Sequence, residues 1–284
     1  MATVFKSIFT SVILALFYPN AEWLQELTDM DHMVDNNTIN LAEVGADPEV
    51  FEDNAVWPLV AKQRTDKGIV IPLHTYDTEP IHVTNVDELE TNYNKAESVS
   101  RQHINVLRTK ASTSAAYNIA PNSHTATTPV LKTTGAPKLD GTKALTFDDI
   151  LDLQTAFDDA ELPQDGRVIL LCPKHKADLK KEDKKLFKEI MQEKEVYGFK
   201  IYTFTRNPKY NPADGTKQPY GAASGSESSI AFVKSEVMRA MGDVKGEPEY
   251  NWALYRGWIL GYQMRFVAMP FRAYGVSAIY SDAA

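Results

Sequence analysis

A helical repeat of buried-type side chains runs through residues 86–118. The repeat consists of Leu89, Tyr93, Ala96, Val99, His103, Ile104, Leu107, Ala111 and Ala115. Positions three or four residues apart lie on one face of a helix, and Pro121 would end that helix. At about 1.5 Å per residue the helix would reach some 45 Å. The pattern therefore predicts a backbone helix that crosses the subunit, rather than one member of a compact bundle.

Alternation typical of strands precedes this helix, from Lys67 to Thr84. One face carries Ile69, Ile71, Leu73 and Thr75, and the alternation resumes at Ile81 and Val83. The residues Asp77 to Pro80 between these runs favour a turn, so the pattern predicts a long β-hairpin. A two-stranded ribbon is marginal in water by itself. We expect it to pack either against another copy of the chain or against the sheet of its own domain.

The N-terminal region begins with the most apolar stretch, Ile8 to Tyr18, which follows Lys6 and superficially resembles a signal peptide. Eleven residues are too few to span a bilayer, and no small-x-small cleavage site follows. We therefore expect a short arm helix that continues into residues 21–27. Residues 28–58 lose periodicity and are expected to lie along another surface, because such a segment buries little by itself.

A second domain is predicted after a connection at residues 122–145, which is rich in Thr, Pro, Gly and Ala and has a β-like piece at 127–133. Thr146 and Asp149 form a variant of the capping box at the start of a helix. Val168 to Cys172 is a continuous apolar run, typical of a strand covered on both faces. The remaining expected elements are a charged helix from 174 to about 195, a strand at 200–204, a loop at 207–228, a strand at 230–233, a helix at 234–241, and strands at 258–268 and 272–280.

Composition excludes fibrous and wholly disordered chains, because 43% of the 284 residues are hydrophobic and 24% are charged. Thirty Lys and Arg against 38 Asp and Glu give a net charge of -8, which disfavours a general basic surface that grips nucleic acid. The single cysteine, Cys172, permits no disulfide within the chain and is expected in the core.

No sequence motif indicates a catalytic or metal site. Phosphate-loop, dinucleotide, zinc-protease, nucleophile-elbow and calcium-loop motifs are all absent from the sequence. His74 and His82 would face each other across the predicted hairpin, but without a third ligand they are better read as solvated strand residues. The Gly221–Gly225 run lacks the basic residue of a phosphate loop, and the charge run Lys174–Lys188 is typical of a solvated helix.

In chain order, the pattern resembles the tailed-bacteriophage major capsid proteins of the Hong Kong 97-type fold. The stretches that carry the resemblance are Thr28-Asp29-Met30, Val34-Asp35-Asn36 and Ala46-Asp47-Pro48 in the arm, Lys67–Thr84, Asp87–Ala120, Leu145–Pro173 with its Leu-Pro-x-x-Gly-Arg turn, Tyr197–Tyr202, and Ser229–Phe232. Some members crosslink a Lys to an Asn; Lys67 lies in the corresponding loop, but no motif identifies a partner, so that chemistry is not carried over.

The resemblance implies an α+β fold with five parts. They are an N-terminal arm at 1–62, an extended β-hairpin loop at 63–86, a peripheral domain with a spine helix at 87–145, an axial α/β domain at 146–262, and closing C-terminal strands at 263–284. The chain is short for such proteins, which argues against an inserted surface domain, and it has no long acidic coiled-coil segment of the kind that serves as a fused scaffold.

The function implied is mechanical: many copies form pentamers and hexamers of an icosahedral virion shell around double-stranded DNA, assembled in the bacterial host cytoplasm. The DNA is expected to be contacted weakly, and portal, scaffolding or decoration proteins are further candidate partners. We expect no enzyme activity, cofactor, metal or membrane partner. The candidate interface residues are Ile69, Ile71, Leu73, Tyr76, Ile81, Val83, Trp23, Leu27, Met30, Met33 and Val34, with the 207–228 loop as a further candidate region.

Three alternatives remain open at this point. A cellular encapsulating shell protein would have the same fold but enclose enzymes. A tail or fibre component would explain the long strands but not the long helix or the α/β domain. A small-molecule enzyme would need the loop at 207–228 to cover a site that the sequence does not reveal.

Overall fold

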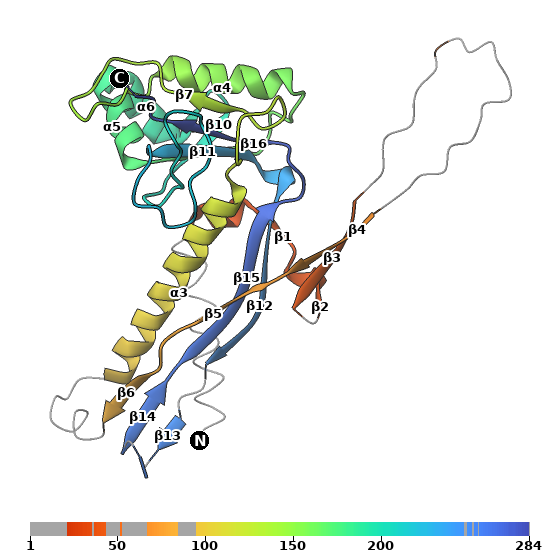
Figure 1. Cartoon of the computed structure of the whole chain (residues 1–284), viewed down its shortest axis with the longest axis vertical. Coiled ribbons are helices and arrows are strands. Elements are labelled where there is room, and N and C mark those ends of the chain that lie inside the picture. The colour runs from red at the N-terminus through yellow and green to blue at the C-terminus, as the bar shows by residue number, and fades with distance from the viewer. Residues whose placement is uncertain are drawn as a thin grey trace.

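The computed structural model describes residues 22–35, 37–43, 52, 67–84, 95–246, 249–251, 253–254 and 256–283. An α/β body lies at one end of the long axis, and a narrower neck of one long helix against a sheet extends from it (Figure 1). The predicted arm helix at 8–18 lies outside the described residues, whereas residues 22–26 form a 3-10 helix, η1 (Glu22–Glu26).

The α/β body is built on a six-stranded mixed sheet in the order β7-β16-β11-β8-β10-β9. Its strands are β7 (Val130–Lys132), β16 (Val276–Tyr280), β11 (Ser228–Val233), β8 (Arg167–Leu171), β10 (Phe199–Thr203) and β9 (Glu195–Val196). The predicted apolar strand is β8, and all five of its residues are buried. Three helices, α4 (Phe147–Asp159), α5 (Pro173–Glu182) and α6 (Lys184–Glu193), cover one face (Figure 1). The other face of this sheet packs on η1 and on the end of the long helix, so both faces are shielded from solvent.

The first helix of this body starts at the predicted capping box. The Thr146 hydroxyl accepts from the Asp149 N–H at 3.2 Å, and the Asp149 carboxylate accepts from the Thr146 N–H at 2.8 Å. Asp149 also accepts from the Thr134 hydroxyl at 2.6 Å, which ties the connecting segment to the helix start.

Replacing Thr146 by Ala is expected to lower the free energy of unfolding by about 1 kcal/mol, because one N-terminal amide of α4 loses its acceptor. Urea unfolding followed by circular dichroism measures this change. Thr155→Ala is the matched control, since its hydroxyl bonds only to the Leu151 carbonyl one turn back in the same helix. An equal loss in both variants would contradict the capping argument.

The neck consists of helix α3 (Lys95–Ile119) against a four-stranded sheet in the order β1-β12-β15-β5. These strands are β1 (Thr28–Asp29), β12 (Val237–Gly246), β15 (Tyr262–Pro270) and β5 (His74–Asp77). The predicted stripe is confirmed from Val99 to Ala115, whose side chains face Tyr262, Met264, Phe266 and Ala268 of β15. At about 1.5 Å per residue, the 25 described residues of α3 span about 37 Å.

Two smaller sheets complete the neck. A short sheet in the order β13-β14-β6 joins β13 (Glu249–Asn251), β14 (Gly257–Leu260) and β6 (Ile81–Thr84) at its far end. A second sheet, in the order β2-β3-β4, comprises β2 (Val34–Asp35), β3 (Thr38–Glu43) and β4 (Lys67–Pro72). We call this second sheet the ribbon. Short 3-10 turns, η2 (Asp31–Met33) and η3 (Lys234–Glu236), lead into β2 and β12.

The ribbon and α3 lie on opposite faces of the neck sheet. Ile39, Ile71 and Leu73 pack against Met238, Ala240 and Val267. Neighbouring residues of β15, such as Phe266 and Ala268, point to α3 instead, because successive side chains of a strand alternate between faces. The ribbon therefore projects from the side of the molecule away from α3 (Figure 1).

The predicted hairpin at 67–84 is wrong. Its strands do not pair with each other: β4 pairs with β3, β5 with β15, and β6 with β14. The expected turn at Asp77–Pro80 is held against the neck, where the Thr78 N–H donates to the Tyr262 carbonyl at 2.9 Å. The alternation of apolar and polar residues correctly indicates strands. It arises because these strands are buried against strands distant in sequence, and not because they pair with each other.

Two predicted helices also differ. The helix expected at 234–241 is the 3-10 turn η3 followed by the start of β12, which pairs antiparallel with β15 from Val237 to Gly246. The charged helix expected from 174 to about 195 is two helices, because Asp183 caps α6 by accepting from the Lys185 N–H at 2.7 Å. The strand expected at 258–268 is divided at Gly261 into β14 and β15.

Strand pairing links segments across the predicted domain bounds, and the division itself stays a prediction. β12 and β14 fall within the 146–262 range expected for the axial domain, yet they pair with β15 and β6 of the neck. In turn, β16 of the C-terminal 263–284 segment pairs with β11 and β7 in the α/β body. The α/β body is therefore assembled from non-contiguous segments.

Candidate assembly surfaces

Five of the eleven candidate interface residues are buried within the chain itself. Trp23, Leu27 and Val83 belong to the main core, and Ile71 and Leu73 belong to the core under the ribbon. Trp23 contacts the Phe204 ring edge-on, with ring centroids 5.4 Å apart. Trp23 and Leu27 hold η1 in the main core, Val83 belongs to β6 of the neck, and Ile71 and Leu73 hold the ribbon on the neck sheet.

The other six candidates keep some surface. Met30, Val34 and Ile69 are half-buried beside the ribbon core, and Tyr76 is half-buried against the main core. Met33 and Ile81 are exposed, with 42% and 37% of their residue surface accessible. The contact of any of the eleven with a neighbouring subunit stays a prediction.

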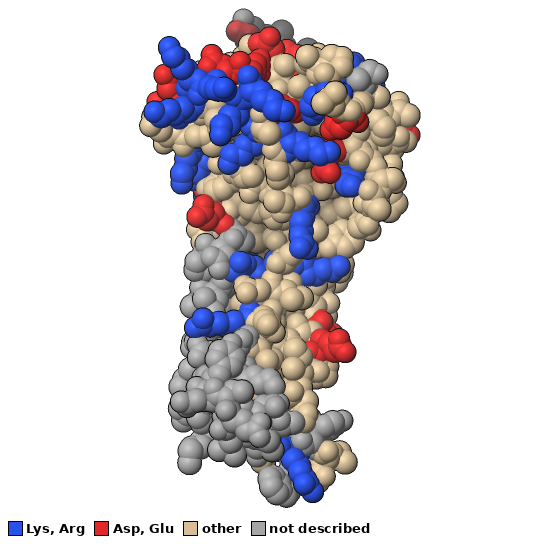
Figure 2. Space-filling view, turned by 90° about the vertical axis from the view of Figure 1, so that its left-hand side faces the viewer, with Lys and Arg blue, Asp and Glu red and all other residues tan. Residues whose placement is uncertain are grey.

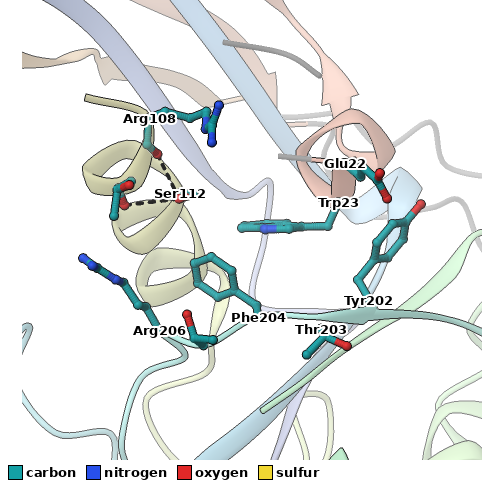
Figure 3. A pocket seen from close by; sticks show the side chains of 10 residues that line it. Glu22, Trp23, Arg108, Ser112, Tyr202, Thr203, Phe204 and Arg206 are labelled. Carbon is teal, nitrogen blue, oxygen red and sulfur yellow. Dashed lines mark hydrogen bonds between the residues drawn. The ribbon is translucent and has the colours of Figure 1, made fainter. Parts of the chain in front are cut away.

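A hollow of about 640 Å³ lies where α3, η1 and the end of β10 meet (Figure 3). Trp23 and Phe204 form its inner surface, with Arg108 of α3 and Arg206 of the loop after β10 on its rim. Partial burial lowers the pKa of the Arg108 guanidinium. Glu22 also lines the hollow. In Figure 3 the Arg108 and Arg206 side chains point in different directions.

Two further hollows lie along the neck. One, of about 730 Å³, lies between α3 and the segment that joins β5 to β6, and it is lined by Tyr76, Ile81 and Val106 among others. The other, of about 520 Å³, lies between β4 and the end of α3, and Lys217 and Asn122 line it. Lys217 Nζ donates to the Tyr117 and Ala120 carbonyls at 3.0 and 2.7 Å, so it caps the C-terminus of α3.

Basic side chains prevail on the face that carries α3. Figure 2 shows Lys and Arg gathered over the α/β body and continuing along the middle of the neck, where Asp and Glu are few. On α3 the charged residues with described side chains are Arg101, Arg108 and Lys110; Arg101 and Lys110 are exposed, as is Arg206. Basic side chains are thus prominent on the described part of this face, although the whole chain has a net charge of -8.

One buried constellation has the residue types of a catalytic site. His175 Nδ1 lies 2.7 Å from Ser229 Oγ, and its Nε2 lies 2.9 Å from Ser281 Oγ. His175 is fully buried, and burial lowers its pKa to about 4. Burial likewise raises the pKa of Cys172 to about 11, so that the thiol remains protonated and unreactive. None of these four residues lines the hollows described above. The core position expected for Cys172 is confirmed.

The two histidines of the predicted hairpin lie in different sheets. His74 pairs with Phe266 in one sheet and His82 with Ile259 in another, so the two are not brought together across a hairpin. Among the residues that the structure describes, no group of three His, Cys, Asp or Glu could hold a metal ion. No helix within the same residues is long and apolar enough to cross a membrane.

Arg108 and Arg206 were missed as site residues by the sequence analysis. The helical repeat identified the buried face of α3 but gave no information on its exposed face, which carries Arg108. Arg206 lies just before the loop expected at 207–228. The signal available was the charge of the helix: residues 95–119 contain Lys95, Arg101, Arg108 and Lys110 against the single acid Glu97.

Comparison with solved structures finds the same fold in assembled shells. A chain in the capsid of cyanophage P-SCSP1u is 19% identical, with a TM-score of 0.68 over 91% of this chain and 87% of that one. The capsid of Ralstonia phage GP4 gives 10% identity and a TM-score of 0.61 over 91% and 87%. The virus-like particle from Pyrococcus furiosus gives 13% identity and a TM-score of 0.59 over 97% and 99%.

Comparison by sequence identifies no relative. No protein-family model matches the chain. No curated protein matches it either. The likeness to the solved structures therefore lies in the fold.

Proposed function

We propose, from the Hong Kong 97-type capsid fold that this chain has, that many copies assemble into the icosahedral shell around the double-stranded DNA genome of a tailed bacteriophage. The main support for the proposal is the extent of the structural similarity. About nine tenths of this chain aligns with about nine tenths of phage capsid chains, and the alignment includes both the neck and the α/β body. A ribbon that projects beyond the subunit body supports it, since such an element gains most of its contacts on assembly.

The proposal includes partners and location. Subunits would cluster as pentamers and hexamers in the virion after assembly in the host cytoplasm, with portal, scaffolding or decoration proteins as further partners. DNA contact would be weak, in line with a net charge of -8. The exposed Met33 and Ile81 are the candidate residues best placed to contact neighbouring subunits.

Purified full-length protein is expected to form closed particles or rings of five and six subunits. Analytical ultracentrifugation gives the size distribution, and negative-stain microscopy shows the shape of each species. A monomer or dimer that persists at all salt and protein concentrations would contradict self-assembly by this chain alone. Repeating the measurement with host lysate tests whether a scaffold is required.

A cellular encapsulating shell is the second candidate, and the Pyrococcus furiosus particle favours it through coverage of 97% and 99% of the two chains. The contents of particles isolated from their natural source separate the two functions. Nuclease-protected DNA of genome length supports the phage shell, and a protein cargo without DNA supports the cellular one.

A catalytic role is not part of the proposal. In the described residues, the hollows hold at most one histidine each, His103 or His74, and no cysteine lines any of them. The buried His175 has neither access to substrate nor a pKa suited to proton transfer near neutral pH.

A further inference from the structure

Helix α3 carries basic residues and no acid over most of its length. From residue 98 to residue 119 the sequence contains Arg101, Arg108 and Lys110, and no Asp or Glu. Arg101 and Lys110 are exposed, and so is Arg206, which lies beside the helix just after β10. At about 1.5 Å per residue, Arg101 and Lys110 lie about 14 Å apart along the helix axis. We call the exposed residues Arg101, Lys110 and Arg206 the basic row.

The basic groups on this face do not converge on one point. The Arg108 and Arg206 side chains point in different directions (Figure 3). Lys110 Nζ lies 4.5 Å from the ring centre of Tyr220, a residue of the 207–228 loop. Figure 2 shows further Lys and Arg along the middle of the neck, with few Asp or Glu among them. Such an arrangement does not enclose a single small anion. It suits a partner whose negative charges repeat along its length.

Acidic side chains gather on another surface, the outer side of α4. Residues 144–166, which include α4, contain no Lys or Arg. The exposed acids of this segment are Asp148, Asp152, Asp158, Asp159, Glu161 and Asp165. Helix α4 and the end of α3 pack on opposite faces of the six-stranded sheet. The net charge of -8 is therefore compatible with basic side chains on the α3 face.

We propose that the basic row contacts the phosphate backbone of the enclosed double-stranded DNA, so that α3 faces the genome. The inference rests on the proposed shell function and names the surface that meets the DNA. Because the ribbon packs on the opposite face of the neck sheet, it would lie on the side away from the DNA.

The dimensions and chemistry of the row fit a duplex. B-DNA carries one phosphate per about 1.7 Å of its axis, so a row about 14 Å long can meet several phosphates at once. The exposed amides of Gln102 and Asn105 lie on the same helix, and amide N–H groups donate to phosphate oxygens. Glu22, exposed beside the nearby hollow, would weaken the contact at that end. A few contacts of this kind give weak binding that is independent of DNA sequence.

Neutralising the row tests the contact. The neutralised variant carries Arg101→Gln, Lys110→Gln and Arg206→Gln. Fluorescence anisotropy of a short labelled duplex, titrated with unassembled subunits at several salt concentrations, measures the affinity. The affinity at low salt is expected to fall about tenfold or more, because counterion release is lost with each phosphate contact. The slope of log affinity against log salt should decrease by about 1 for each contact removed.

Two further variants separate charge from damage to the fold. The control neutralises three exposed basic residues of other elements, and it should bind like the wild type: Lys234→Gln, Lys245→Gln and Arg256→Gln. A charge-conserving variant should also keep the affinity, since a phosphate contact depends mainly on charge: Arg101→Lys, Lys110→Arg and Arg206→Lys. Circular dichroism and urea unfolding check every variant, because Lys110 also contacts Tyr220.

Cysteine labelling shows which side of the shell α3 occupies. The native Cys172 is buried, so a thiol introduced by Gln102→Cys on α3 is the reactive one. In intact filled particles this thiol should be protected from a bulky maleimide reagent, and it should react once the particles are opened. Labelling in intact particles would place α3 on the outside and overturn the inference.

Other outcomes would also overturn it. If the neutralised variant binds the duplex as tightly as the wild type at every salt concentration, the basic row does not contact DNA, and the proposed shell function is unaffected. If poly-L-glutamate displaces the duplex at an equal concentration of charges, the row fits an acidic protein instead of DNA. A wild type that binds DNA through the row but never assembles would contradict the shell function, and not the DNA contact.

Discussion

Replacing Arg167 by Ala is expected to lower the free energy of unfolding by about 3–5 kcal/mol, through two buried acceptors left unsatisfied and the loss of packing. The guanidinium is almost fully buried at the start of β8. Its Nη2 donates to the Leu162 carbonyl at 2.9 Å, and its Nε donates to the Pro163 carbonyl at 2.9 Å. The charge also lies 5.6 Å from the ring centre of Phe157.

The ion pair itself should account for little of this effect. Arg167 Nη2 lies 2.6 Å from Asp158 Oδ1, but the Asp158 side chain is 41% exposed. Water can therefore solvate the carboxylate once the arginine is gone, and an ion pair this exposed contributes about 1 kcal/mol or less. Asp158→Ala is the matched variant, and it should be several-fold milder than Arg167→Ala.

Urea unfolding of the three proteins separates the two contributions. Arg167→Lys is a further variant for the same measurement, because lysine keeps the positive charge but cannot direct separate N–H donors to the two carbonyls. If Asp158→Ala were as damaging as Arg167→Ala, the ion pair rather than the carbonyl bonds would hold this turn. If Arg167→Lys were as stable as the wild type, charge alone would suffice.

The turn that contains Arg167 is where sequence analysis worked best. Thr146 and Asp149, the Leu-Pro-x-x-Gly-Arg turn and the apolar strand after it are local signals, and the structure confirms each of them. The Hong Kong 97-type fold expected from the order of elements is confirmed by the solved capsid structures. Local sequence signals are enough to predict the structure where the residues in contact are also close in sequence.

The neck shows why the rest could not be predicted. Apolar and polar residues alternate in 67–84 as they would in a hairpin. The actual partner strands, β3, β15 and β14, are distant in sequence, and the local sequence does not indicate them. Val237 to Met241 carries good helix formers, and only the pairing with β15 makes it a strand. Trp23 and Leu27 are buried in their own chain because η1 packs on the α/β sheet, and this packing leaves no local signal in the sequence.

Acid is expected to destabilise the α/β body through His175, by about 2 kcal/mol between pH 7 and pH 5. Burial is the main cause of its low pKa, about 4, and nearby Lys138 adds to it, while Asp178 and Asp149 act in the opposite direction. In the unfolded chain the pKa is near 6.5. The unfolded state then binds more protons as pH falls below 6.5, so stability is lost progressively down to about pH 4.

His175→Gln should flatten this pH dependence, even though the variant is less stable at neutral pH. Urea midpoints at pH 7, 6 and 5 give the slope for each protein. Acids with lowered pKa values, such as Asp140 and Asp282, lose their contribution only at lower pH, and they are common to both proteins. Equal slopes in variant and wild type would exclude His175 as the source.

The hydrogen-bond network explains how protonation would act on the fold. Ser229 Oγ accepts from the Cys172 N–H at 3.1 Å and lies 2.7 Å from His175 Nδ1. His175 Nε2 lies 2.9 Å from Ser281 Oγ, which is just after β16. A second proton on the ring would make both ring nitrogens donors and place a charge in the core. Because this histidine joins α5, β11 and the chain end after β16, we expect acid to loosen the closing strand of the α/β body first.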